Sequence, residues 1–286
     1  MKREIAEIAK NEKISEVGFC SAEEYIKKAK GLPREASFCS SQDAEKLLED
    51  AKTVIVCAFS YYSGAEKGNI SRYAWGLDYH KVAVEKMSSI VELLNKKGYS
   101  GAAFADNGAL NERLLAKLAG IAFIGKNYMA INERLGSYFF VGYVITDCEI
   151  EPDKENNSEC MGCGACRAAC PLGAIGENDF CEERCLSYIT QKKGELSREE
   201  STALRECGTI WGCDICQEVC PHNKNLPQTG IDEFRENLIT TLHIDENISN
   251  KEFKRMYGNR AFAWRGKNIL IRNQKIVYNK EEKTHV

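Results

Sequence analysis

A short run of cysteines in the middle of the chain has the spacing of an iron–sulfur ligand set. It reads C-x2-C-x2-C-x3-C-P and consists of Cys160, Cys163, Cys166, Cys170 and Pro171. In bacterial ferredoxins, three thiolates of such a run surround one [4Fe–4S] cluster, and the fourth cysteine ligates the other cluster. The pattern therefore predicts a second run elsewhere in the chain.

A second, incomplete run follows about fifty residues later. It reads C-x2-C-x3-C-P and consists of Cys213, Cys216, Cys220 and Pro221. Two [4Fe–4S] clusters need eight thiolates, and the two runs together supply four plus three. The remaining ligand must come from outside the runs, and the candidates are Cys181, Cys185 and Cys207.

Ligand exchange between the runs predicts two groups of cysteines. One cluster takes Cys160, Cys163, Cys166 and Cys220, and the other takes Cys170, Cys213, Cys216 and the additional cysteine. Structural zinc is the simpler alternative, because C-x2-C pairs also form zinc ribbons. A zinc ribbon, however, does not require a third cysteine at the x2 spacing or a Cys-Pro at the x3 spacing. We therefore favour the two-cluster interpretation.

The composition is that of a globular protein in a reducing compartment. The chain has 286 residues, of which 43% are hydrophobic and 28% charged. Fourteen cysteines would suggest disulfides only in a small secreted chain. No apolar signal segment follows Met1, and no apolar run approaches the ~20 residues of a membrane span. We expect a cytoplasmic protein without membrane association.

Charge is unevenly distributed along the chain. The net charge is −3, but residues 251–286 contain ten Lys and Arg against three Glu, a local charge of +7. Such a segment could contact phosphates. The simpler explanation is a solvated helix face, and charge alone favours that explanation.

The order of predicted elements indicates an α/β domain followed by two smaller segments. Apolar runs predict strands over 17–20, 53–59, 102–105 and 138–146. Helical spacing predicts helices over 2–12, 22–30, 44–50 and about 80–97, and Ser21 is the expected N-cap of the second. A further helix follows Gly108 and ends at about residue 119. Helix–strand alternation with short connections is typical of α/β domains. The predicted domains are residues 1–150, a dicluster domain at 151–228 and a basic helical region at 229–286.

Asp106 is the first candidate for chemistry outside the cysteines. It ends a predicted strand, and ligands bind at that end of the strands in open α/β sheets. The sequence Asp106-Asn107-Gly108 also strongly favours a turn, so these residues alone favour an N-cap or Asx-turn role for Asp106. Gly125-Lys126-Asn127 lacks the spacing of a phosphate loop and is expected to form a turn with a solvated lysine.

His80 ends the aromatic segment 71–80. Asp78-Tyr79-His80 begins like the D-x-H-x-x-G pattern of some cobalamin proteins, but position 83 is Ala. The pattern therefore fails, and His80 is not assigned as a cobalt ligand.

Taken together, these motifs resemble the epoxyqueuosine reductase family over about residues 5–278. The resemblance rests on motifs that occur in the family's order: Ser71-Arg72-Tyr73-Ala74-Trp75-Gly76-Leu77-Asp78-Tyr79-His80, Asp106-Asn107-Gly108 with Glu112-Arg113, Gly125-Lys126-Asn127, Gly136-Ser137, the first cysteine run, Arg184-Cys185-Leu186-Ser187-Tyr188 and Trp211-Gly212-Cys213.

The resemblance implies a cobalamin-dependent oxidoreductase with two [4Fe–4S] clusters. Such an enzyme reduces epoxyqueuosine to queuosine at the wobble position of tRNA. Low-valent cobalamin attacks the epoxide, and the clusters relay electrons from an external low-potential donor. The fold implied is an α/β (α+β) cobalamin-binding domain with a ferredoxin-like dicluster module and a short helical C-terminal region. The resemblance also suggests a monomer.

The resemblance also assigns roles to individual residues. Cys185 matches the family's isolated cluster ligand, and Asp106 matches the acidic residue beside the substrate, which overturns the N-cap interpretation. A proton for the opened ring would come from Asp106, whose pKa burial against the corrin would raise. By motif position, the residues that line the corrin or substrate pocket are Arg72, Tyr73, His80, Lys126 and Asn127.

The chain departs from the family pattern at three places. Asp106-Asn107-Gly108-Ala109 stands where the family has Asp-Thr-Gly-Pro, Trp211 stands where Tyr is common, and the helical repeats that grip tRNA in longer members are shortened here. The alternatives are a paralogue acting on another small substrate, dehalogenase-like in chemistry, and a non-catalytic dicluster electron carrier. Reductive dehalogenases typically carry a twin-arginine export signal, which we do not find at this N-terminus.

Overall fold

The chain forms two compact units, each built from segments that are separate in the sequence. The computed structural model describes residues 1–30, 49–64, 66–106 and 108–278, so the helix predicted over 44–50 falls almost entirely outside the described residues. The first unit contains 1–62, 79–161 and 222–232, and the second contains 63–78, 162–221 and 233–286.

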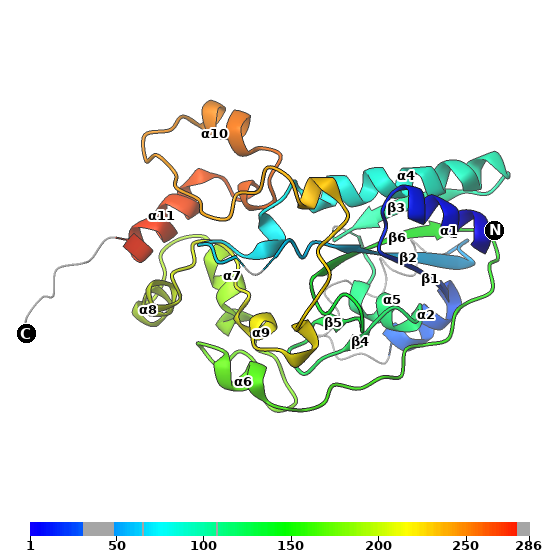
Figure 1. The fold of residues 1–286 in the computed structure, drawn as a ribbon, viewed down its shortest axis with the longest axis horizontal. Helices are drawn as coiled ribbons and strands as arrows, with labels where there is room; N and C mark the ends of the chain where they lie inside the picture. Colours follow the sequence, from blue (N-terminus) through cyan, green and yellow to red (C-terminus); the bar gives the residue numbers. More distant parts are fainter. Residues whose placement is uncertain (31–48, 65, 107, 279–286) are drawn as a thin grey trace, which may run out of the picture. The chain divides into compact units, whose positions relative to one another are not determined.

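The centre of the first unit is a four-stranded antiparallel sheet in the order β1-β2-β6-β3 (Figure 1). Its strands are β1 (Glu16–Ser21), β2 (Thr53–Ser60), β3 (Gly101–Ala105) and β6 (Phe139–Thr146). All eight residues of β2 and all eight of β6 are buried. This explains why both strands are near-continuous apolar runs in the sequence, a pattern expected when both faces of a strand are covered.

Helices cover both faces of this sheet. Helix α4 (Tyr79–Lys96) packs on β3 and β6 and contacts α1 (Lys2–Asn11), whereas α5 (Glu112–Leu118) packs on β1, β2 and β6 beside α2 (Ala22–Ala29). Figure 1 shows these pairs on opposite sides of the strands. Side chains of a strand alternate between faces, and Val54 and Val56 share one core cluster with Leu114 and Leu115 of α5. The first unit is therefore a three-layer α/β/α arrangement.

The strand directions decide which ends meet. Adjacent strands are all antiparallel, with Ser60 paired to Phe139 and Ala105 paired to Gly142. The ends of β2 and β3 therefore lie at the same edge as the start of β6. Asp106 follows β3 directly at this edge. A two-stranded hairpin, β4 (Phe123–Ile124) with β5 (Ala130–Ile131), was not predicted and packs on α5.

The second unit consists mainly of short helices. They are α6 (Ala165–Ala169), α7 (Leu186–Gln191), α8 (Arg198–Cys207), α9 (Ile215–Glu218), α10 (Asn250–Tyr257) and α11 (Lys267–Tyr278), with 3-10 turns between several of them. One of its apolar clusters contains Leu186, Ile189, Ala203 and Leu204, and side chains of α11 pack against it. Asn273 of α11 is fully buried, and its amide donates to the carbonyl oxygens of Thr190 and Ile210 at 2.7 and 2.8 Å.

This packing differs from the three predicted segments. Residues 233–278 belong to the same compact unit as 162–221, because α11 packs on α8 and α7. Residues 63–78 also belong to this unit, although the sequence placed them within the first domain. The functions assigned to the three predicted domains stay predictions. Over the described part of the chain, none of the helices combines the length and apolar character that a membrane span requires.

Candidate functional site

Asp106 lies at the sheet edge with its carboxyl group half-exposed. Its backbone is in the left-handed region at φ 59°, which few residues other than glycine adopt and which aspartate tolerates better than most. Its Oδ2 accepts a hydrogen bond from the Tyr79 hydroxyl at 2.5 Å and lies 3.0 Å from His80 Nε2. The structure therefore brings two of the predicted site residues, His80 and Asp106, into direct contact.

Tyr79 was not among the predicted site residues, yet it connects Asp106 to an aromatic stack. Its ring lies 4.0 Å from the Phe140 ring at an interplanar angle of 3°, and the His80 ring stacks on it at 4.1 Å. Tyr61, directly after β2, adds a fourth ring 4.4 Å from Phe140. These residues come from α4, β6 and the end of β2, so the antiparallel sheet places flat apolar rings beside one carboxylate.

Glu112 is a second carboxyl group that the sequence did not single out by role. It begins α5, and its Oε1 accepts a hydrogen bond from the backbone N–H of Asp106 at 2.5 Å. This bond holds Asp106 in its left-handed conformation. A glutamate in the first turn of a helix is common because it stabilises the helix dipole, so this position alone does not mark a site residue.

The two carboxyl groups differ in protonation. Hydrogen bonds from His80 and then Tyr79 lower the pKa of Asp106 against the opposing effect of burial. Burial raises the pKa of Glu112 to about 8, and the nearby Asp106 charge raises it further. At neutral pH the pair therefore holds one proton, on Glu112. Hydrogen bonds to the Asp106 carboxylate thus outweigh its desolvation. The expectation that burial against a corrin raises this pKa concerns the ligand-bound protein and stays a prediction.

Lys126 and Asn127 lie in the β4–β5 hairpin. Lys126 is exposed, whereas Asn127 is 5% exposed and its Oδ1 accepts the N–H of Met129 at 3.3 Å. Arg113 of α5 donates to the carbonyl oxygen of Tyr128 at 2.9 Å, which ties the hairpin to the helix that carries Glu112. The described contacts of Asn127 are those of a turn residue, and its predicted role in a cofactor pocket stays a prediction.

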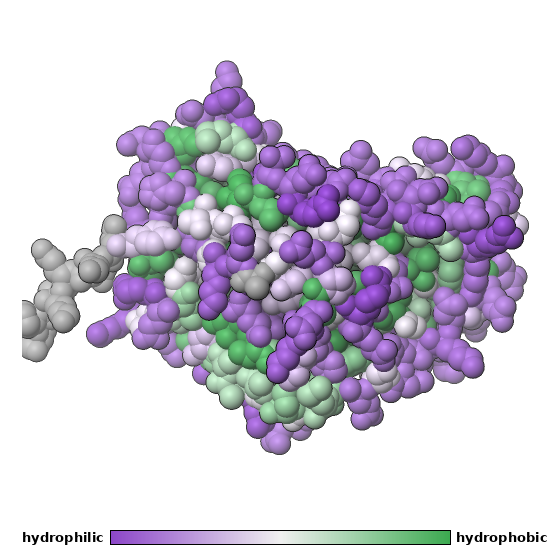
Figure 2. Space-filling view, viewed as in Figure 1, coloured by the Kyte–Doolittle hydropathy of each residue, from purple (hydrophilic) through white to green (hydrophobic). Residues whose placement is uncertain are grey.

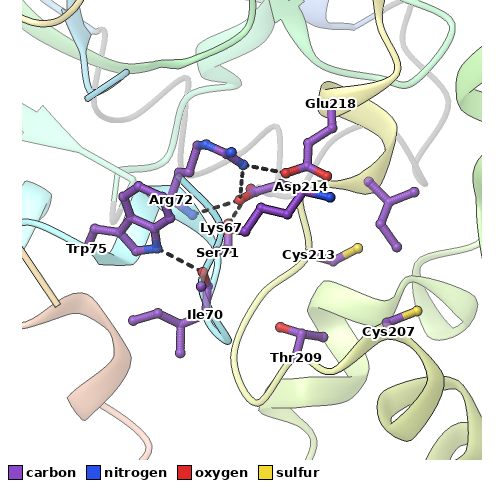
Figure 3. A pocket seen from close by; sticks show the side chains of 12 residues that line it. Lys67, Ile70, Ser71, Arg72, Trp75, Cys207, Thr209, Cys213, Asp214 and Glu218 are labelled. Carbon is purple, nitrogen blue, oxygen red and sulfur yellow. Dashed lines mark hydrogen bonds and ion pairs between the residues drawn. The ribbon is translucent and has the colours of Figure 1, made fainter. Parts of the chain in front are cut away.

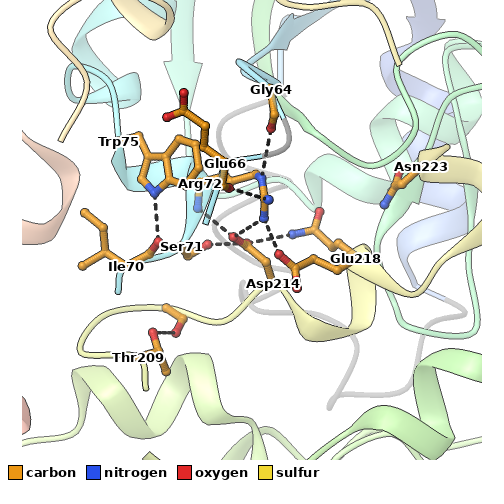
Figure 4. A network of polar contacts seen from close by, with 12 residues as sticks. Gly64, Glu66, Ile70, Ser71, Arg72, Trp75, Thr209, Asp214, Glu218 and Asn223 are labelled. Carbon is orange, nitrogen blue, oxygen red and sulfur yellow. Dashed lines mark hydrogen bonds and ion pairs between the residues drawn. The ribbon is translucent and has the colours of Figure 1, made fainter. Parts of the chain in front are cut away.

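Arg72 and Tyr73 belong to the second unit, where Arg72 takes part in a buried ion-pair network rather than presenting a free cation (Figure 4). Its Nη1 lies 2.6 Å from Glu218 Oε1 and 3.4 Å from Asp214 Oδ2. Tyr73 packs against Gly212. Both residues contact the segment that carries the second cysteine run. Their predicted place in a corrin or substrate pocket stays a prediction.

Four cysteines from three separate segments lie near one another in the second unit: Cys170, Cys185, Cys213 and Cys216. Burial raises the pKa of the Cys216 thiol, and the neighbouring Cys213, Cys185 and Cys170 raise it further. Burial likewise raises the pKa of Cys213 to about 12, and Cys185 is again among its neighbours. This is the group that ligand exchange between the runs predicts. Cys207 also neighbours Cys170 and Cys213, so proximity alone does not select the additional ligand.

Backbone N–H groups distinguish Cys185 as a thiolate site. The N–H groups of Tyr188 and Ser187, at the start of α7, donate to the Cys185 sulfur and oppose the effect of burial on its pKa. The N–H of Ile215 does the same for Cys213, and the N–H of Ala174 lies 3.2 Å from the Cys170 sulfur. Such bonds stabilise thiolates and tune bound clusters. The donor set therefore fits a cluster held by Cys170, Cys185, Cys213 and Cys216.

The two cysteine runs also lie against each other. Helix α6, which carries Cys166, packs against α9, which carries Cys216. The first run turns sharply because Gly162 and Gly164 have φ +67° and +73°, a conformation that costs glycine little. The turn leaves Cys163 exposed, and hydrophobic colour lies over α6 on a mainly hydrophilic face (Figure 2).

Across the described residues, no three Cys, His, Asp or Glu side chains converge as closely as the ligands of a single metal ion. A four-iron cluster takes its thiolates on separate iron atoms and so spaces them more widely.

Comparisons with known proteins define the class of protein. A family model for the "4Fe-4S double cluster binding domain" matches residues 159–223, and a model described as "Epoxyqueuosine reductase QueG, DUF1730" matches residues 42–107. The chain is thus an iron–sulfur protein with a double-cluster domain.

Full-length relatives are more specific. The chain is 34% identical to an epoxyqueuosine reductase of Lactococcus garvieae over 97% of its own length and 86% of the relative. It is also similar to the structure of an epoxyqueuosine reductase with an epoxyqueuosine-modified tRNA-Tyr stem loop, with a TM-score of 0.82 and 29% identity over 96% of this chain and 80% of that one.

A Bacillus subtilis epoxyqueuosine reductase, described with its catalytic aspartate loop swung out of the active site, gives a TM-score of 0.81 at 29% identity over 96% of this chain and 80% of that one. The chain belongs to the epoxyqueuosine reductase family, whose members are oxidoreductases.

The assignment of Cys185 can be tested by iron and sulfide analysis after anaerobic reconstitution. Replacing Cys185 with alanine should lower both contents by about half, because one of two clusters loses a ligand. Cys207→Ala and Cys181→Ala are the matched controls and should keep full content. Loss in the Cys207 variant with retention in the Cys185 variant would reverse the assignment.

The protonation of Glu112 predicts a pH-dependent stability. Burial holds its folded-state pKa at about 8, well above the ordinary pKa of a glutamate. The folded chain therefore keeps a proton that the unfolded chain releases, and stability falls as pH rises through this window. The slope is at most about 1.4 kcal/mol per pH unit.

Denaturant unfolding at pH 5 to 9 checks this prediction. Glu112→Gln keeps an acceptor for the Asp106 N–H but does not titrate, so its unfolding free energy should lose this part of the pH dependence. Identical pH profiles for the two proteins would refute the assignment of the proton to Glu112.

Proposed function

We propose that this chain reduces epoxyqueuosine to queuosine in the anticodon of tRNA. The observation that carries the proposal is the half-exposed Asp106 carboxyl group beside a flat aromatic stack, in a chain of this family with the two cysteine runs. Two relatives support it. One was solved with an epoxyqueuosine-modified tRNA stem loop, and the other is described as having a catalytic aspartate loop.

The cofactors that we assign are two [4Fe–4S] clusters and cobalamin. The thiolates of one cluster would come from Cys170, Cys185, Cys213 and Cys216, and those of the other from Cys160, Cys163, Cys166 and Cys220. An external low-potential donor would reduce the clusters. The stacked rings of His80, Tyr79 and Phe140 form an apolar wall beside Asp106, which suits a large, mainly apolar ligand such as a corrin. When bound, cobalamin supplies a low-valent cobalt that is a strong nucleophile toward strained carbon.

The protein's own contribution at the reacting ring is a proton. Opening an epoxide generates an alkoxide, which a positioned acid must protonate. In the absence of substrate, Asp106 is ionised, since His80 and Tyr79 stabilise its carboxylate. A ligand that covers the half-exposed carboxyl would remove water from it and raise its pKa. We therefore assign Asp106 as the acid that acts in the closed complex, with Tyr79 and His80 orienting it.

The basic C-terminal segment offers a smaller RNA-binding surface than its charge suggests. Arg260 donates to the carbonyl oxygens of Trp75 and Asn237, and Arg272 donates to those of Lys192 and Gly194, so both guanidinium groups are used within the unit.

Other basic groups of this segment face solvent. Lys254 and Arg255 of α10 are exposed, and Trp264 is 61% exposed with the Arg265 guanidinium 3.8 Å from its ring. Exposed aromatic–arginine pairs stack on unpaired bases, and neighbouring cations contact phosphates. We propose that Trp264, Arg265 and α10 bind the anticodon stem-loop.

The role of Asp106 is tested by queuosine formation from epoxyqueuosine-containing tRNA, followed by nucleoside mass spectrometry under anaerobic conditions. Asp106→Asn keeps the shape but cannot supply the proton, and we expect the rate to fall roughly 10²- to 10⁴-fold. Cluster content and tRNA affinity should stay at wild-type values. A wild-type rate in this variant would exclude Asp106 as the acid.

The RNA surface is tested by equilibrium binding of the stem-loop at several salt concentrations. Trp264→Ala should weaken binding by about 1–3 kcal/mol without changing the salt dependence. Lys254→Ala should reduce the slope of log K against log salt by about one if it contacts a phosphate. Lys193, an exposed lysine of the same unit, provides the matched control. Unchanged affinity in both variants would place the RNA elsewhere.

A further inference from the structure

Asp214 lies between two proposed cluster ligands and carries a buried carboxylate. It is one of the two residues that separate Cys213 from Cys216, and its side chain is 8% exposed. It occupies the N-cap position of α9, but its carboxylate makes no capping hydrogen bond. An aspartate at this position normally caps its own helix. Here the carboxylate is directed to another segment instead.

Both oxygens of this carboxylate are occupied by residues 71 and 72 (Figure 4). Oδ1 accepts the Ser71 hydroxyl at 2.5 Å, and Gln217 Nε2 lies 3.4 Å away. Oδ2 accepts the backbone N–H of Arg72 at 2.8 Å, and Arg72 Nη1 lies 3.4 Å away. A buried charge that is so fully hydrogen-bonded is costly to remove from one side only.

Arg72 is fixed as firmly as its partner. It is 7% exposed, and its Nη1 also bonds to Glu218 Oε1 at 2.6 Å, while Nη2 donates to the carbonyl oxygen of Glu66 at 2.9 Å. Its guanidinium lies 5.2 Å from the Trp75 ring. One cation therefore faces two carboxylates, and the group carries a net charge of about −1 beside the cysteine run.

The backbone brings this group and the cysteine run together. Residues 69–71 pair with 210–211, with Ile210 N–H donating to Asn69 and Ser71 N–H donating to Trp211, both at 2.7 Å. A side chain at Gly212 would place its Cβ 2.5 Å from the Ser71 Cβ. A cavity of about 150 Å³ is lined by Arg72, Asp214 and Cys213, among other residues (Figure 3). The charges thus lie close to a cluster thiolate with few ways to relax.

We propose that the buried Asp214 carboxylate and the Arg72 guanidinium set the reduction potential of the cluster held by Cys170, Cys185, Cys213 and Cys216. The proposal rests on the cluster assignment made above. Reduction adds one electron, which a nearby carboxylate disfavours and a nearby guanidinium favours. Because both groups are largely removed from water, their effect on the cluster is only weakly screened. Asp214 lowers the potential, and Arg72 limits how far it falls.

The test is an anaerobic redox titration of the reconstituted full chain, followed by EPR of the reduced cluster. Asp214→Asn removes the charge and keeps the shape. We expect the ratio of reduced to oxidised cluster at a fixed potential to rise roughly tenfold, which is about 59 mV for a one-electron couple. Arg72→Met should shift the ratio in the opposite direction. Glu218→Gln removes a carboxylate whose side chain is 35% exposed and therefore better screened by water, so it should shift the ratio like Asp214→Asn but less.

Glu195→Gln, an exposed carboxylate of the same unit, is the matched control, and Ser71→Ala tests the hydrogen bond without changing charge. Iron and sulfide content shows whether each variant retains its clusters. If Arg72→Met loses them, the shift expected in Asp214→Asn and the unchanged potential expected in Glu195→Gln still decide the matter.

A potential in Asp214→Asn equal to that of the control, or shifts of the same sign in the Asp214 and Arg72 variants, would overturn the proposal. Absence of any cluster signal in the wild-type chain would instead contradict the cofactor assignment, so the two failures are distinguishable.

Discussion

The fully buried pairing of β2 with β6 is the interaction on which the first unit depends. Both strands can be apolar along their whole length only because helices cover both faces of the sheet. Their register fixes where β2 ends and β6 begins, and so places Tyr61 and Phe140 against each other. Asp106 follows the neighbouring strand at the same edge. The geometry of the carboxylate and the rings is thus a consequence of strand pairing, not of any local motif.

Buried polar contacts connect distant segments of the second unit, beside buried aromatic side chains such as Trp75, Trp211 and Phe262. The Asn273 amide hydrogen-bonds α11 to the carbonyl oxygens of Thr190 and Ile210. The Asp214 carboxylate connects residues 71–72 to the second cysteine run in the same way. Each is satisfied by several partners, so removing one partner leaves a buried group unpaired. A unit held in this way tolerates little displacement around its thiols, which suits a role in electron transfer.

The sequence predicted the strands and the cysteine groups because both signals are local. Apolar runs and Cys spacing can be recognised within ten residues. The role of Arg72 could not be found this way, because its carboxylate partners are more than 140 residues away. The proton on Glu112 depends likewise on burial and on the neighbouring Asp106. The β4–β5 strands have two residues each and carry no periodic signal. Family resemblance supplied Asp106 and Cys185 where spacing left alternatives.

The thiols proposed for one cluster come from three separate segments of the chain, and this has a consequence for biosynthesis. In the proposed ligand set, Cys170, Cys185 and Cys216 surround a cluster only after α7 and α9 have docked, so insertion of this cluster would follow the synthesis of most of the chain. Conversely, α7 and α8 share an apolar cluster whose buried members are Leu186, Ile189, Ala203 and Leu204, and a bound iron–sulfur cluster at Cys185 would add to what holds α7 in place. Oxygen damage to the cluster should then loosen the second unit while the sheet of the first remains folded, and proteases would recognise such chains by that unit.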